Sequence, residues 1–256
     1  MAHGSHAGAL VRGAAIRQQG MAMTSRFMLC SFKTCPWVQR AAIVLRQKQV
    51  AYDITYIERD KDKRPDWFLA ISPHGKVPVL RIDGKDALFE SNAIAEYLDE
   101  TVAPRLHPED PVARARNRAW TDYVATFAGT VSSTMYADSE EELVARAAKI
   151  SGAFGKLDDA LSRRGNAGPY FNGPTLSLVD AAYAPFLQRY TFMDRLRPLG
   201  IIEKYPHLAA WRDALLSAPA VKASTVPDIE AAWQDNLHAQ RRWLAKFVPL
   251  SVPGAA

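Results

Sequence analysis

The chain has 256 residues, of which 48 % are hydrophobic and 23 % charged, a composition typical of a globular protein large enough for two domains. It contains no apolar run near the ~20 residues that cross a bilayer, so we expect no membrane-spanning segment and no membrane partner. The formal net charge is +5, but Lys and Arg never run longer than two residues, which favours a solvated surface over a nucleic-acid-binding patch.

The two cysteines are Cys30 and Cys35. So few cysteines exclude a disulfide scaffold and indicate a reducing compartment, so we predict a cytoplasmic protein. Cys30 lies in a predicted strand, five residues before Cys35, and pairing of the two is not expected. We interpret Cys30 as a small buried hydrophobic residue.

Residues 1–22 form an appendage rich in Gly, Ala and His and free of acidic residues. The apolar runs are too short for a secretory signal. We interpret the segment as an expression tag or an upstream start, with Met21 or Met23 as alternative first residues. The acid-free, Arg-bearing composition leaves an organellar transit peptide open.

A strand, a helix and a second strand are predicted next. "RFMLCSF" (26–32) is short, apolar and bounded by turn residues, and "AYDITYI" (51–57) alternates and is rich in β-formers. Between them Pro36 suits a first helical position. The helix has one buried face, made by Val38, Ala41, Ala42 and Leu45. This order predicts a parallel strand pair with a crossover helix.

The next segment completes an α/β domain over residues 23–103. A short helix is predicted within "RPDWFLAIS", then two strands on either side of the hairpin signal Gly84-Lys85. A helix over "ESNAIAEYLDETV" follows, with Ser91 as its expected N-cap. The predicted order is β-α-β-α-β-β-α.

A proline-rich linker over residues 104–110 separates this domain from an all-helical one over residues 111–256. Two long helices are predicted over residues 111–164, interrupted near "YADSEEE". Three more are predicted in "LSLVDAAYAPFLQRYTFMD", "YPHLAAWRDALLSAP" and "VPDIEAAWQDNLHAQRRWLAKF".

Cys35 immediately precedes the predicted helix. The free N–H groups and positive partial charge of a helix N-terminus favour a thiolate, so we expect a reactive thiol of lowered pKa. Lys33 and Arg40 add positive charge nearby. The residue three positions on is Val38, so the dithiol of a disulfide oxidoreductase is absent. The alternative is a buried structural cysteine.

Two further short motifs are candidates for ligand binding. In "HGKVPVL", Pro78 interrupts a predicted strand, which indicates an edge, a bulge or a cis bond. With a cis bond, the backbone of Val77 would be free to pair with an extended peptide. In "FESNAI", Glu90 and Ser91 lie at a strand-to-helix junction, where they could bind the ammonium and carboxylate of an α-amino acid. The alternatives are an edge proline and a plain helix cap.

Residues 26–247 resemble a cytosolic glutathione transferase. The motifs "CPWVQR", "RPDWFLAISPHGKVPVL", "ESNAIAEYLDE" and "FNGPTLSLVDAAYAPF" occur in the order and spacing of that family. The resemblance implies a thioredoxin-like α/β domain followed by an all-α domain. The Cys-Pro start is most similar to the omega class, and the last third is also similar to bacterial omega-like glutathione lyases.

The resemblance also implies roles for individual residues. Cys35 would form a mixed disulfide with glutathione, and Val77 would pair with its backbone just before a cis Pro78. Glu90 and Ser91 would hold its γ-glutamyl head. The cation for the glycyl carboxylate would be Arg64 or Lys63, although the preceding loop is about two residues longer than in the omega pattern, and Lys76 stands at a usually apolar place.

Other residues are expected to be structural or to contact substrate. Asp180 and Ser177 match a buried helix-capping motif of the family, a variant of the capping box. Between the domains we expect two or three aromatic residues to contact an electrophilic substrate. The candidates are Trp120, Tyr123, Phe127, Tyr183, Phe186, Tyr190 and Trp233.

The resemblance implies a homodimeric, omega-like glutathione-dependent enzyme. Glutathione would be its co-substrate and no metal is expected, since no His/Cys/Asp cluster has metal-ligand spacing. The expected reaction is thiol transfer or reductive cleavage of a glutathione thioether through Cys35. The alternatives are conjugation of glutathione to hydrophobic electrophiles and a non-catalytic binding protein of the same fold.

Overall fold

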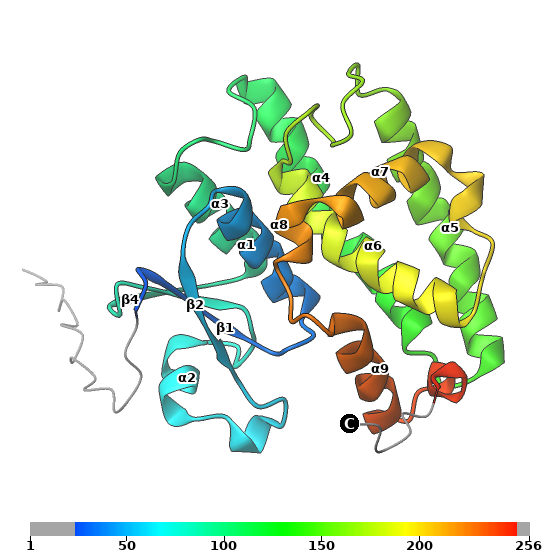
Figure 1. Cartoon of the computed structure of the whole chain (residues 1–256), viewed down its shortest axis with the longest axis horizontal. Helices are drawn as coiled ribbons and strands as arrows, with labels where there is room; N and C mark the ends of the chain where they lie inside the picture. Colours follow the sequence, from blue (N-terminus) through cyan, green and yellow to red (C-terminus); the bar gives the residue numbers. More distant parts are fainter. Residues whose placement is uncertain (1–23, 250–256) are drawn as a thin grey trace, which may run out of the picture.

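The computed structural model describes residues 24–249, so the predicted appendage 1–22 lies outside the described residues. Residues 24–101 form a four-stranded sheet with helices on both faces (Figure 1). The strand order is β2-β1-β3-β4, with β1 parallel to β2 and antiparallel to β3, and β3 antiparallel to β4. The elements are β1 (Phe27–Ser31), α1 (Pro36–Gln47), β2 (Tyr52–Tyr56), α2 (Asp66–Ile71), β3 (Val79–Ile82), β4 (Asp86–Phe89) and α3 (Ser91–Thr101).

Alternation along β1 divides the core of this part between the two faces of the sheet. Phe27 and Leu29 pack with the buried faces of α1 and α3. Met28 and Cys30 pack on the opposite face with Phe68 of α2. Because successive side chains of a strand point to opposite faces, a five-residue strand buried throughout serves both layers.

The second part of the chain is all-helical. Its helices are α4 (Pro111–Met135), α5 (Glu140–Ser162), α6 (Leu178–Leu196), α7 (Pro206–Ser217), α8 (Pro219–Lys222) and α9 (Ile229–Ala239), with short 3₁₀ turns at Lys61–Lys63, Ile202–Lys204 and Trp243–Phe247. Helix α6 lies centrally and packs against α4, α7 and α1 (Figure 1). The predicted fold class, an α/β part followed by an all-helical part, is confirmed.

Helix α6 begins at the predicted cap. Ser177 and Asp180 form a complete capping box, and Asp180 is fully buried. Its carboxylate also accepts hydrogen bonds from the N–H of Phe171 (2.9 Å) and from Nε1 of Trp211 (2.6 Å). Asp180 therefore ties the loop before α6 and helix α7 to the start of the central helix.

Two local predictions were wrong. The last predicted helix ends at Ala239, because Arg241 adopts a left-handed conformation (φ 52°). Ser91 is the first residue of α3, and its N-cap is Glu90, which has φ 66°. β4 ends at Phe89, so a single residue must turn the chain from strand into helix, and Glu90 takes that conformation.

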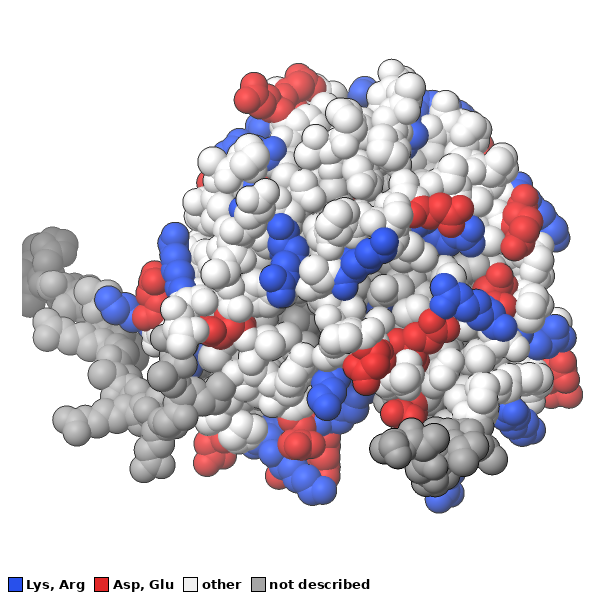
Figure 2. All heavy atoms as spheres, in the orientation of Figure 1, with Lys and Arg blue, Asp and Glu red and all other residues white. Residues whose placement is uncertain are grey.

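Charges are dispersed over the surface. Figure 2 shows Lys and Arg interspersed with Asp and Glu on the face in view, without a large area of one sign. None of the helices in residues 24–249 combines the length and apolar character needed to cross a membrane.

Candidate functional site

Cys35 is the N-cap of α1, and Pro36 is the first residue of the helix. Its backbone N–H donates to the carbonyl of Phe32, and its carbonyl accepts from the N–H of Gln39, which closes the first turn. The thiol side chain is partly exposed and lines a cavity of about 210 Å³ between the two parts of the chain. Cys35 therefore lies at the start of a helix, as the sequence predicts.

The structure does not support the expected acidity of the Cys35 thiol. Burial raises the pKa of the Cys35 thiol above its ordinary value. Hydrogen bonding from the N–H groups of Val38 and Trp37 and the positive charges of Arg189 and Arg59 act against burial without overcoming it. The prediction of a lowered pKa was therefore wrong, because the sequence shows the helix start but not the depth of the thiol.

Cys30 differs from Cys35 in its position, although burial raises the pKa of both thiols. It is fully buried within β1 and does not line the cavity. Burial raises the pKa of its thiol to about 12, and Arg81 alone acts against that rise. These features agree with an inert core cysteine.

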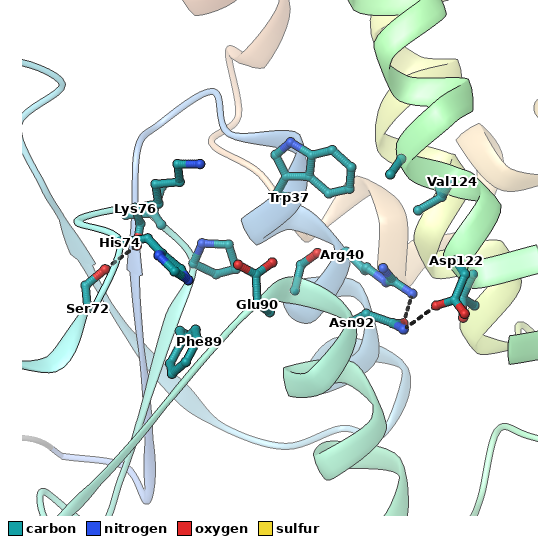
Figure 3. Close-up of a pocket in the computed structure, with 15 residues that line it drawn as sticks. Trp37, Arg40, Ser72, His74, Lys76, Phe89, Glu90, Asn92, Asp122 and Val124 are labelled. Carbon is teal, nitrogen blue, oxygen red and sulfur yellow. Dashed lines mark hydrogen bonds between the residues drawn. The ribbon is translucent and has the colours of Figure 1, made fainter.

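A second cavity, of about 440 Å³, contains the other predicted binding residues (Figure 3). Val77, Pro78, Glu90 and Ser91 all line it. The Val77–Pro78 bond is cis, and the β-ladder of the sheet starts only at Val79, so the backbone of Val77 lies outside the strand pairing. The two sequence motifs that contain these residues are thus brought to one site.

The wall of this second cavity carries charges of both signs. Glu90 points into it from the junction of β4 and α3 (Figure 3). Asn92 accepts a hydrogen bond from the guanidinium of Arg40 and donates to Asp122 at 3.2 Å, which links α1, α3 and α4. Carboxylates, a cation and the free N–H groups of a helix start together suit a zwitterionic head group.

Trp37 borders both cavities. It follows Pro36 on α1 and lines both the cavity of Cys35 and the cavity of Glu90. Its ring packs edge-on against Phe186 with 4.8 Å between ring centroids. The two cavities therefore share the Trp37 side chain as part of their walls.

The two predicted cations lie elsewhere. Arg64 donates hydrogen bonds to the carbonyls of Glu58, Arg59 and Gly75, so its guanidinium holds the loop before α2. Lys63 is exposed and pairs with Asp60 at 3.5 Å. Neither Arg64 nor Lys63 lines either of the two cavities.

Lys76 and His74 lie in the second cavity instead, next to Val77 (Figure 3). Lys76 is held by its backbone, since its carbonyl accepts a hydrogen bond from Ser72. The sequence signal for this cation was the lysine at position 76, where the family pattern usually has an apolar residue. The sequence analysis noted this departure but assigned no role to it.

Most of the predicted substrate-contacting aromatic residues are core residues. Four are at most 1 % exposed, namely Phe127, Tyr183, Tyr190 and Trp233. Trp120 and Tyr123 are half-buried and pack against each other outside the cysteine cavity. Phe186 alone of the seven lines that cavity. Helical spacing marks a buried face without distinguishing a core from a cavity wall, so it could not select among the seven candidates, and their contact with substrate stays a prediction.

The sequence reasoning missed the other residues around Cys35. The side chains that line its cavity include Phe32, Trp37, Arg59, Tyr136 and Arg189. They come from the loop after β1, α1, the loop after β2, the end of α4 and the middle of α6. No local motif could have grouped positions so distant in sequence. Among residues 24–249, no group of three or more His, Cys, Asp or Glu side chains is placed to hold a metal ion.

Comparison with known proteins agrees with this arrangement. Residues 34–101 match the glutathione S-transferase N-terminal domain, and residues 137–214 match the glutathione S-transferase C-terminal domain. The chain is 35 % identical over 182 residues to glutathione S-transferase L1 of Arabidopsis thaliana, covering 70 % of this chain and 73 % of the relative. It is 28 % identical over 231 residues to glutathione S-transferase omega-1 of Rattus norvegicus, covering 88 % and 92 %.

A solved structure is also similar. Glutathione transferase Omega 3C from Trametes versicolor superposes with a TM-score of 0.68 at 28 % identity, covering 78 % of this chain and 89 % of that chain. Both family domains and the omega relatives therefore match this chain along most of its length. The chain belongs to the glutathione S-transferase family and is related to its omega class.

Proposed function

We propose that this transferase is a thiol transferase that acts through a mixed disulfide between Cys35 and glutathione. The observation that carries the proposal is that Trp37 borders two cavities, one with the Cys35 thiol and one with Val77, Glu90 and Ser91. A tripeptide bound in the second cavity can place its sulfur at the thiol.

Glutathione would bind by its two charged ends and its backbone. Glu90 would take the ammonium of the γ-glutamyl head, and Ser91 with the first turn of α3 would take its carboxylate. Val77 would pair with the cysteinyl backbone. We propose Lys76, in place of Lys63 or Arg64, as the cation for the glycyl carboxylate, since it lines this cavity.

The reaction consists of two thiol–disulfide exchanges. The Cys35 thiolate attacks the glutathionyl sulfur of a mixed disulfide, the S–S bond breaks, and the second thiol leaves as its thiolate. A glutathione thiolate then attacks the glutathionyl sulfur on Cys35, which releases the Cys35 thiolate and glutathione disulfide. Arg189 and Arg59 lower the free energy of the thiolate in each exchange.

A second candidate function is conjugation of glutathione to an electrophile. The raised pKa of Cys35 favours this alternative, because a protonated thiol can donate a hydrogen bond to a bound glutathione thiolate. In conjugation Cys35 never becomes covalently bonded to glutathione.

The fate of Cys35 separates the two functions. Incubation of the protein with glutathione disulfide should add one glutathionyl group to Cys35, removable by reductant and located by peptide mass mapping. Cys35→Ser should form no adduct and should lose reduction of mixed disulfides, while the matched Cys30→Ser should still form it. Strong conjugating activity in the wild type, without any adduct, would favour the second function.

The proposed binding of the γ-glutamyl head group by Glu90 and Ser91 is tested at Ser91. Ser91→Ala removes one hydrogen-bond donor to the γ-glutamyl carboxylate of bound glutathione. The variant should bind glutathione more weakly by about 1–3 kcal/mol, measured by calorimetry. Thr101→Ala, at the exposed other end of α3, serves as the control and should leave the affinity unchanged. Unchanged affinity in Ser91→Ala would place the head group elsewhere.

We also propose that the protein acts as a homodimer in the cytoplasm. Two cysteines without a disulfide suit a reducing compartment, and the family resemblance supports the dimer. Light scattering during gel filtration measures the assembly directly, and a monomeric mass at micromolar concentration would contradict it.

A further inference from the structure

Arg189 is a buried arginine without a carboxylate partner. It lies in the middle of α6, is 2 % exposed and lines the cavity of Cys35. Among residues 24–249, the groups whose charge acts on it are Tyr136 and Cys35, and none is an Asp or Glu. Burial lowers its pKa to about 10, which reflects the missing counter-charge. Buried charges in proteins are normally paired, so this guanidinium lacks an anion.

One edge of the guanidinium is only partly used. Nη1 donates to the side-chain oxygens of Gln39 (2.7 Å) and Gln188. Nη2 makes a long contact of 3.4 Å with the carbonyl of Thr34, and Nε has no partner among the described residues. Nε and Nη2 form one side of the planar group, the side that can bind a carboxylate through two parallel hydrogen bonds.

A second arginine lines the same cavity from the other part of the chain. Arg59, in the loop after β2, donates a hydrogen bond to the hydroxyl of Thr34, and its guanidinium lies over the ring of Phe32. No Asp or Glu of the described residues forms an ion pair with Arg59. Both arginines therefore hold Thr34, one at its carbonyl and one at its hydroxyl.

The rest of the wall is largely aromatic. Phe32, Trp37, Tyr136 and Phe186 line the cavity together with Cys35. An aromatic wall with two unpaired cations suits a small aryl group that carries an anion. A planar carboxylate matches the edge of Arg189 that Nε and Nη2 form.

From this arrangement we infer that the substrate cavity is selective for the carboxylate form of its substrate, which Arg189 binds with help from Arg59. The inference rests on the proposed thiol transfer and specifies its substrate class: mixed disulfides between glutathione and an aryl thiol that bears a carboxylate. Cys35 attacks the glutathionyl sulfur, the S–S bond breaks, and the carboxylated aryl thiolate leaves while Arg189 holds its acid group. No external oxidant or reductant other than glutathione is needed.

Two matched substrates test the charge preference. The mixed disulfides of glutathione with 4-mercaptophenylacetic acid and with 4-mercaptophenylacetamide have similar leaving thiols and differ in one charge. We expect the wild type to have a kcat/KM at least about tenfold higher for the acid, which corresponds to about 1.4 kcal/mol. Arg189→Met keeps the volume and burial but removes the charge, so the ratio should fall to about one. The control Arg195→Met, on the exposed side of the same helix, should keep the wild-type ratio.

The ratio separates substrate binding from an effect on the thiol. If Arg189 served only to stabilise the Cys35 thiolate, Arg189→Met would slow both substrates equally and leave the ratio unchanged, which would overturn the inference. A loss of affinity for glutathione itself in Arg189→Met would also overturn it, since the arginine would then bind the glycyl carboxylate.

A binding measurement keeps the inference testable if the proposed thiol transfer fails. Titration of the full chain with phenylacetate and with phenylacetamide, followed by calorimetry, reports the carboxylate subsite without any chemistry at Cys35. Tighter binding of phenylacetate that is lost in Arg189→Met supports the subsite even when no Cys35–glutathione adduct forms. Equal binding of the two probes would overturn it.

Discussion

Replacing Asp180 with Asn should destabilise the whole protein, although the two side chains have nearly the same shape. The carboxylate is fully buried and accepts four hydrogen bonds. Their donors are the N–H of Phe171 (2.9 Å), the N–H (2.7 Å) and hydroxyl (2.6 Å) of Ser177, and Nε1 of Trp211 (2.6 Å). An amide presents two hydrogens where the carboxylate has lone pairs, so it cannot serve all four donors.

The magnitude follows from this geometry. If the amide oxygen of Asn keeps Phe171 and Trp211, its NH₂ group faces the N–H of Ser177, which loses its acceptor. A hydrogen bond to a charged group contributes about 1.5–3 kcal/mol, and a buried donor left unsatisfied costs about 1–3 kcal/mol. We therefore expect a loss of about 2–5 kcal/mol from a free energy of unfolding of about 5–15 kcal/mol. At about 2–4 °C per kcal/mol, Tm should fall by roughly 4–20 °C.

The assay is urea and thermal unfolding at pH 7, followed by circular dichroism. Asp159→Asn, at a largely exposed position paired with Arg163, is the matched control and should change stability by less than about 0.5 kcal/mol. Burial raises the pKa of Asp180, and its four donors act against burial. If Asp180→Asn cost no more than the control, the carboxyl would be neutral in the fold and our argument from an ionised acceptor would be refuted.

Two further predictions concern thiol reactivity and acid stability. At pH 7, iodoacetamide should label Cys35 long before Cys30, because Cys35 is partly exposed and lines a cavity whereas Cys30 is fully buried in β1; peptide mapping that found Cys30 labelled first would contradict this. Burial would raise the pKa of Glu96, but His107 and Arg118 outweigh it and hold that pKa at about 2, below the unfolded value of about 4.3. Glu96 thus stabilises the fold above that unfolded value, and this contribution of about 1–3 kcal/mol is lost as pH falls towards 2. Glu96→Gln should lose it at pH 7, and urea titrations should show the two proteins converging at pH 2; a constant difference would contradict the assignment.

Short-range patterns predicted most of the fold. Pro36 and the spacing of apolar residues after it define α1, and the alternation along β1 defines a strand buried on both faces. These signals depend on residues a few positions apart, so the secondary structure of each segment can be predicted from its own sequence. The same holds for the capping box of Ser177 and Asp180, whose partners are three residues apart.

The binding motifs were also readable one by one. Val77 with Pro78, and Glu90 with Ser91, were each predicted from a strand or helix boundary. Their convergence on one cavity depends on the pairing of β3 with β4 and on the turn at Glu90. The family resemblance predicted that these residues bind one ligand, whereas the local patterns alone did not.

What the sequence by itself determined is the order of the elements, the two-part architecture and the place of Cys35 at the start of a helix. Tertiary structure alone decided how deeply the thiol is buried, and hence that its pKa is raised. It also decided that Tyr190 is a core residue while Arg189, its neighbour on α6, lines a cavity. The physical reason is that helical periodicity shows which side of a helix is buried, whereas the packing of distant segments decides whether that side meets side chains or an open site.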